Sequence, residues 1–103
     1  QMFLQMQQTR PDIDAIFCTN DDLAVGVLLE CQAQGKAVPQ AIAIAGFHGL
    51  EIGRARLQKI ASVITPRYEI GKTASEILIA RLTGKDAPDS VNLAYQIYYG
   101  DTL

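Results

Sequence analysis

Residues 11–26, PDIDAIFCTNDDLAVG, contain the strongest indication of the fold of this chain. Within it, residues 15–18 (AIFC) form a short apolar run, which predicts a strand buried on both faces. Asn20 follows as a good N-cap, and the two aspartates after it would lie in the first turn of a helix, where negative charge is favourable. This helix is expected to continue to about Gln34, with Gly35 as the residue that ends it.

Further segments extend this strand and helix into an α/β fold. Residues 41–47 (AIAIAGF) are a second apolar strand, so strand, helix and strand predict a right-handed unit with parallel strands. Residues 1–9 have helical spacing but no cap, as in a piece of a longer helix. Residues 61–64 predict another strand. Thr65 and Pro66 are then expected to cap and open a helix that closes at Gly84, and residues 92–99 (NLAYQIYY) predict a last strand.

The composition is that of a globular protein. Of the 103 residues, 49% are hydrophobic and 19% are charged, which excludes a disordered chain. No apolar run reaches the ~18 residues of a membrane helix and no leader opens the chain, so we expect a soluble cytoplasmic protein without a membrane partner. The net charge of −2 argues against binding of nucleic acid by this stretch alone, because phosphate contacts need clustered Lys and Arg.

Catalysis and metal binding are not expected. Two cysteines and one histidine do not make a metal site, and the glycine-rich phosphate motifs of cofactor sites are absent. One alternative is a hydrolytic enzyme with Cys18 as nucleophile, His48 as base, and Asp21 or Asp22 to orient that base. Because Cys18 lies inside an apolar run, we interpret it as a core residue and expect neither an enzyme nor a cofactor.

Polar residues follow both predicted parallel strands. Asn20 comes after the first strand and His48 after the second. Ligands of open parallel sheets bind beyond the carboxyl ends of the strands, so these two side chains are expected to project into one crevice. Asn20 could instead be only a helix cap, and His48 only a loop residue bonded to backbone. Their coincidence at one edge favours a binding site for a small polar molecule.

The helix after Asn20 has more apolar surface than one sheet requires. Ala24, Val27, Leu28 and Cys31 make one stripe that suits the sheet. Val25 and Leu29 extend the apolar surface sideways. Either a partner subunit covers this second stripe or the core-facing stripe is broad.

Three ordered segments carry a family resemblance. Residues 11–26 resemble the pattern P-D-A-I-F-x-x-N-D-x-x-A-x-G, residues 42–48 (IAIAGFH) resemble V-S-V-x-G-F-D, and residues 61–71 (ASVITPRYEIG) resemble L-T-T-V-x-Q-P-x-x-x-G. These patterns belong to the LacI/GalR family of bacterial transcription regulators, and within that family the chain looks most similar to regulators of gluconate operons. The resemblance implies a periplasmic-binding-protein-like (type I) effector domain, of which this chain is the C-terminal portion.

The resemblance also implies a division of the chain. Residues 1–65 would belong to the C-terminal lobe of a sugar-binding domain, residues 66–84 would form a helix that crosses to the other lobe, and residues 85–103 would return as a strand. The helix-turn-helix that binds operator DNA would lie outside this chain. A lobe of a sugar-binding transport protein with the same fold is the alternative.

By the same resemblance, the ligand-binding positions are Asn20, His48, Thr65 and Arg67. The family has Asp where this chain has His48 and an apolar residue where it has Arg67. A sugar acid brings a carboxylate that Asp would repel and Arg could bind through two hydrogen bonds, so the expected effector is gluconate or a related aldonate. The family's homodimer contact implies Val25, Leu28 and Leu29 as interface residues. The implied activity is that of a repressor that releases operator DNA when the effector binds.

Overall fold

The structure is a computed structural model that describes residues 1–103. Its elements, in chain order, are α1 Met2–Thr9, β1 Ala15–Phe17, α2 Asp21–Ala33, β2 Ala43–His48, α3 Glu51–Arg54, β3 Ala61–Ile64, α4 Arg67–Leu82 and β4 Gln96–Tyr98. This order confirms the α/β prediction, although the sequence pattern does not reveal α3, and β4 is shorter than the predicted strand. None of the helices combines the length and the hydropathy that a membrane crossing requires.

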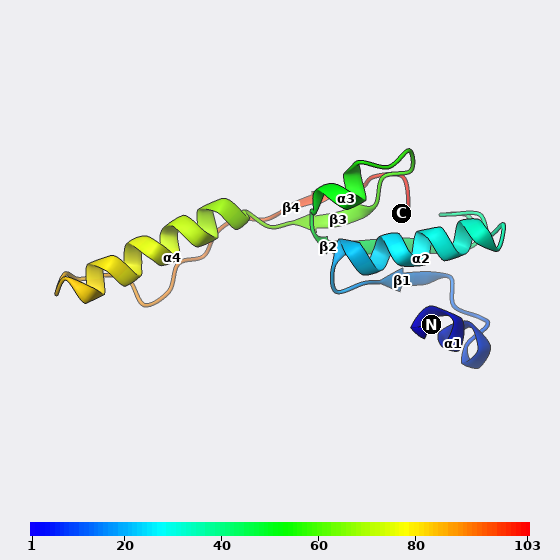
Figure 1. Cartoon of the computed structure of the whole chain (residues 1–103), viewed down its shortest axis with the longest axis horizontal. Helices are drawn as coiled ribbons and strands as arrows, with labels where there is room; N and C mark the ends of the chain where they lie inside the picture. Colours follow the sequence, from blue (N-terminus) through cyan, green and yellow to red (C-terminus); the bar gives the residue numbers. More distant parts are fainter.

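The strands form one sheet in the order β1-β2-β3-β4 (Figure 1). β1, β2 and β3 run parallel, and β4 is antiparallel to β3. The predicted strand-helix-strand unit is therefore confirmed as β1, α2 and β2. Because β1, β2 and β3 are parallel, their carboxyl ends lie at one edge of the sheet, and this edge is the place to look for a site.

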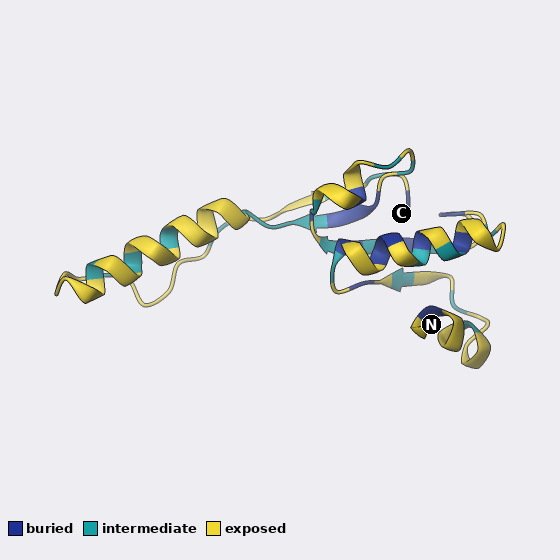
Figure 2. Cartoon of the chain, viewed as in Figure 1, coloured by how far each residue is buried: buried dark blue, intermediate teal, exposed yellow.

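Helix α2 packs on one face of the sheet and supplies much of the core (Figure 2). Leu28 and Cys31 of α2 have 0% exposure, as do Ile42, directly before β2, and Ile44 within it. Burial of a side chain such as Leu contributes roughly 1.5–3 kcal/mol, so this contact is a main source of stability. The prediction that residues 15–18 are buried on both faces is wrong, because α2 covers a single face and Phe17 remains 63% exposed.

Helix α4 extends away from the sheet, and the chain measures 58 × 28 × 17 Å along its principal axes (Figure 1). None of its residues is buried, and Leu78 and Leu82 are 58% and 78% exposed. Helix α4 therefore packs against no other element of this chain along its length. The prediction that Thr65 caps it is wrong: the N-cap is Pro66, and no side chain makes a capping hydrogen bond, because the Thr65 hydroxyl faces His48 instead.

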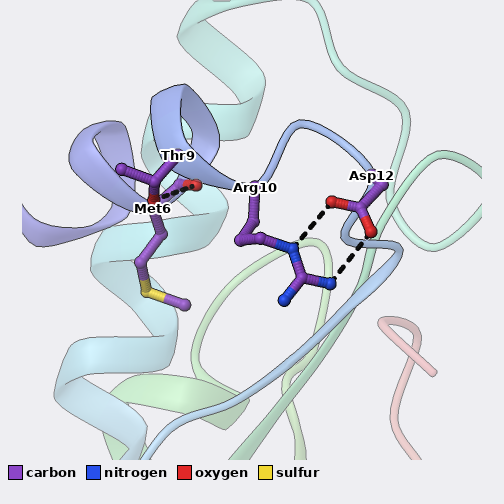
Figure 3. Close-up of polar contacts among 4 residues, drawn as sticks. All are labelled: Met6, Thr9, Arg10 and Asp12. Carbon is purple, nitrogen blue, oxygen red and sulfur yellow. Dashed lines mark hydrogen bonds and ion pairs between the residues drawn. The ribbon is translucent and has the colours of Figure 1, made fainter.

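Local polar contacts hold the turn between α1 and β1 (Figure 3). The Arg10 backbone N–H donates to the Met6 carbonyl at 2.7 Å, which closes the last turn of α1. The Arg10 guanidinium donates two 2.9 Å hydrogen bonds to the Asp12 carboxylate, and these lower the pKa of that carboxyl. Both side chains are exposed, so the pair shapes the turn more than it stabilises the fold.

The C-terminal segment joins β2 to β3. Thr102, with 0% exposure, donates from Oγ1 to the Ile44 carbonyl at 2.6 Å and accepts from the Ala61 N–H at 2.9 Å. Its own carbonyl accepts from the Ile44 N–H at 2.7 Å. One buried residue therefore satisfies backbone groups of both strands, each of which would cost about 1–3 kcal/mol if left unpaired in the core.

Gly46 of β2 lets the first turn of α2 approach the strand, and this close contact can be tested. A Cβ at this position would collide with the Asp21 carboxylate and lie 3.1 Å from Asp21 Cα. We expect Gly46→Ala to lower the free energy of unfolding by about 2 kcal/mol, because overpacking costs about 1–3 kcal/mol. Urea denaturation followed by circular dichroism measures the change.

Gly26→Ala is the matched control for this prediction. Gly26 lies on the exposed side of α2, and a Cβ there meets nothing within 4 Å. The alanine should raise the free energy of unfolding by about 0.5–1 kcal/mol through helix propensity alone. Equal stabilities of the two variants would contradict the close contact at Gly46.

Candidate functional site

The carboxyl ends of the parallel strands carry three of the four predicted site residues. Asn20 follows β1, His48 is the last residue of β2, and Thr65 follows β3. In the sheet register His48 lies beside Ile64, the residue before Thr65. The structure therefore brings His48 and Thr65 together, and it places Asn20 at the end of the adjacent strand.

His48 has an unusual backbone conformation at the end of β2. Its φ is 89°, and it is the one residue other than glycine with a positive φ. Nδ1 of its exposed imidazole lies 3.2 Å from Thr65 Oγ1, and the ring packs edge-on against Phe47 with centroids 4.7 Å apart. With Nδ1 engaged by Thr65, Nε2 is the atom left for a ligand. Strained backbone of this kind persists where the surroundings hold it, and it is concentrated at functional sites.

Asn20 caps α2, as the sequence predicts. Its Oδ1 accepts a hydrogen bond from the Leu23 N–H at 2.9 Å. The cap uses only the oxygen, so the amide nitrogen of this half-buried side chain stays available to a ligand. Capping and ligand binding are therefore compatible in one residue.

Arg67 is the exposed first residue of α4. The ion pairs in the structure join other residues, namely Arg10–Asp12, Lys72–Glu76 and Arg81–Asp89. The guanidinium of Arg67 consequently keeps its N–H donors for an anion. Its backbone N–H donates to the Thr65 carbonyl at 2.9 Å, which keeps the start of α4 close to Thr65.

Asp21 is the residue at this edge whose importance the sequence does not reveal. It lies in the first turn of α2, as predicted, but it is 1% exposed. Its carboxylate accepts hydrogen bonds from Ser62 Oγ at 2.7 Å and from the Leu50 backbone N–H. The available signal was Gly46, which leaves room for the carboxylate, but that room is recognisable only once β2 is placed beside α2.

Both cysteines are buried. Burial raises the pKa of the Cys18 thiol and of the Cys31 thiol, which disfavours the thiolate that a nucleophile needs. The structure brings no three potential metal-ligating side chains together. The strand ends are therefore better suited to holding a polar molecule than to nucleophilic catalysis by Cys18.

Two of the three predicted dimer-interface residues are buried within this chain. Val25 is 4% exposed and Leu28 is 0% exposed, whereas Leu29 is 44% exposed. The broad core-facing stripe therefore accounts for Val25 and Leu28. Leu29 is the residue of the three whose side chain is open to a partner.

A cavity of about 670 Å³ lies away from the strand-end residues, between α1, β1 and α2. Its lining is mostly apolar and includes Phe3, Phe17 and Leu23, but none of the four predicted ligand-binding residues. A polar ligand needs hydrogen-bond partners, so the strand ends remain the better candidate site.

Comparisons with known proteins place these features in a family context. The family model for the periplasmic binding protein-like domain matches residues 1–103. The chain is 49% identical to the HTH-type transcriptional regulator IdnR of Escherichia coli K12 over 104 residues, which cover 100% of this chain and 31% of that relative.

Solved structures agree. The transcription regulator GntR from Chromobacterium violaceum superposes with a TM-score of 0.89 and 37% identity, covering 98% of this chain and 38% of that one. A LacI family transcriptional regulator from Arthrobacter sp. FB24, in complex with lactose, gives a TM-score of 0.79 and 25% identity, covering 95% and 38%. The chain thus spans about a third of the length of the proteins it matches.

The backbone at His48 gives a test of strain. We expect His48→Val to lower the free energy of unfolding by about 1–2 kcal/mol relative to His48→Gly, because a β-branched residue tolerates positive φ poorly and glycine adopts it readily. Both variants lose the imidazole contact with Thr65, so that loss cancels in the comparison. His48→Asn, which tolerates this region, should lie near the glycine variant. Urea denaturation measures all three, and equal stabilities of the valine and glycine variants would exclude strain at this position.

Proposed function

This chain belongs to the periplasmic-binding-protein-like domain family, in the form carried by LacI-family transcriptional regulators, and from that premise we propose that it binds a sugar acid. It is the C-terminal part of the effector-binding domain of a repressor. The effector is gluconate or a related aldonate. The observation that carries this proposal is the Arg67 guanidinium, which takes part in no ion pair. Arg67 is the first residue of α4, and it lies two residues after Thr65, whose hydroxyl contacts His48.

The chemistry of these side chains suits a carboxylate with hydroxyls beside it. Arg67 can donate two parallel hydrogen bonds to a carboxylate, which is the geometry that makes Arg a carboxylate receptor. His48 offers Nε2, and Asn20 offers its amide nitrogen, to the neighbouring hydroxyls. An Asp at position 48 would repel the same carboxylate, so the departure from the family pattern favours an acidic over a neutral sugar.

The position of Thr65 links the ligand to a change in lobe arrangement. Thr65 lies between β3 and α4, where residues 66–84 would cross to the other lobe and residues 85–103 would return. A ligand held by His48, Thr65 and Arg67 contacts both the sheet edge and this crossover. It therefore favours one arrangement of the lobes to the extent that it binds that arrangement more tightly. In the arrangement that the ligand favours, the spacing of the DNA-binding parts of the two subunits does not match the operator, so operator DNA is released.

The remaining partners follow from the same proposal. The DNA-binding part lies outside this chain, whose net charge of −2 fits a segment without phosphate contacts. The protein acts in the cytoplasm, beside its operator. The likeness to transcriptional regulators favours this role over a lobe of a transport protein.

Ligand preference tests the proposed carboxylate contact. Isothermal titration calorimetry on the intact regulator should show tighter binding of D-gluconate than of its neutral alditol, D-glucitol. We expect Arg67→Gln to lower the affinity for gluconate by roughly 10–100-fold, since a hydrogen bond to a charged group contributes about 1.5–3 kcal/mol. His48→Asp should lower the affinity for gluconate more than the affinity for glucitol. Lys72→Gln, which removes a charge farther along α4, should change neither affinity, and equal affinities for both ligands in every variant would refute the carboxylate contact.

The exposure of Leu29 provides a test of the homodimer. Leu29→Asp should shift the intact regulator toward monomers in sedimentation velocity, because a charge in an apolar interface is poorly solvated. Gln40→Asp, at an exposed position outside this helix, is the control and should leave the dimer intact. Leu28→Asp should unfold the domain, because Leu28 is in the core. A Leu29→Asp protein that remains fully dimeric would remove Leu29 from the interface.

A further inference from the structure

A buried hydrogen-bond cluster lies beneath the strand-end residues. We name it the Asp21 clasp, and it consists of the side chains of Asp21 and Ser62 and the backbone amides of Gly49 and Leu50. Asp21 is 1% exposed and Ser62 is 6% exposed. The carboxylate accepts from Ser62 Oγ at 2.7 Å and from the Leu50 N–H, and Ser62 Oγ in turn accepts from the Gly49 N–H at 3.1 Å.

Each part of the clasp adjoins a proposed ligand-binding residue. Asp21 follows Asn20 directly. The two backbone amides belong to the residues after His48. Ser62 lies in β3, three residues before Thr65. We propose that Asp21 is a positioning residue of the effector site, whose carboxylate sets the relative placement of these three residues without contacting the ligand. This inference rests on the proposed function and adds to it the element that orders the site.

The backbone around His48 needs such support. Its φ of 89° is followed by a φ of 67° at Gly49. Both amides after His48 are held by the clasp, and the Gly49 carbonyl accepts from Arg54 Nη2 at 3.2 Å. A Cβ on Gly49 would lie 2.8 Å from Ile64 Cγ1, so the loop also sits close to β3. Hydrogen bonds and packing together hold the conformation that aims the imidazole at Thr65.

A carboxylate is the group that fits this position. It accepts from a hydroxyl and from a backbone N–H at the same time, one on each oxygen. An amide would place a donor against one of these two groups and leave a buried donor without an acceptor. Gly46 completes the arrangement, since any side chain there would collide with the carboxylate.

The test measures the conformation at His48 separately from ligand binding. The intact regulator is labelled with nitrogen-15 histidine, and the His48 amide signal is identified by its loss in His48→Gln. Asp21→Asn and Ser62→Ala should each shift or broaden this signal in the absence of ligand. Each should also lower the affinity for D-gluconate about tenfold. Asp22→Asn, which removes the same charge from an exposed site in the same helical turn, should change neither readout.

A second control separates positioning from stability. Val25→Ala should lower the melting temperature through the core and leave the His48 signal in place. If Asp21→Asn and Ser62→Ala lower the melting temperature but, like Val25→Ala, leave the His48 signal and the gluconate affinity unchanged, the clasp is structural only and the proposal is overturned. If Asp21→Asn does not fold, the His48 signal and the gluconate affinity of Ser62→Ala, which retains the carboxylate, decide whether the clasp positions His48. Should the wild type not bind gluconate, the proposed function fails, while the His48 signal still decides the role of Asp21.

Discussion

The packing of α2 against β2 is the contact on which the other features depend. Leu28 and Cys31 on the helix meet Ile42 and Ile44 on the sheet side, all without solvent exposure. This contact sets the distance and direction of the helix. The first turn of α2 therefore begins at the carboxyl edge of the sheet, where a helix N-terminus and polar side chains can face a ligand.

The buried polar groups at the same edge have hydrogen-bond partners, which offset the cost of their burial. The buried carboxylate of Asp21 accepts two hydrogen bonds, and Asn20 satisfies an amide at the start of α2. A buried charge without such partners would be strongly unfavourable. Arg67 differs from the paired arginines at positions 10 and 81, since its guanidinium has no carboxylate beside it.

The shape of the chain is consistent with one part of a larger effector domain. Helix α4 buries none of its residues, and Phe17 is exposed on a strand that the sequence predicts as buried. Both observations describe apolar surface without a cover in this chain. Thr65 joins the ordered sheet to this uncovered helix, so a ligand at the strand ends would act at the boundary between them.

Local patterns in the sequence predicted the order of the strands and of the helices other than α3, the cap at Asn20, the helix end at Gly35 and the strand-end position of His48. They could do so because capping and hydrophobic periodicity act over a few residues. The burial of Asp21, and the contact of Thr65 with a side chain in place of a cap on α4, follow from long-range packing. Those outcomes depend on segments far apart in the chain: Asp21 bonds to residues 29 and 41 positions away, and Thr65 meets a histidine 17 positions before it. The burial of a polar side chain is set by which segments pack around it, and no local pattern carries that information.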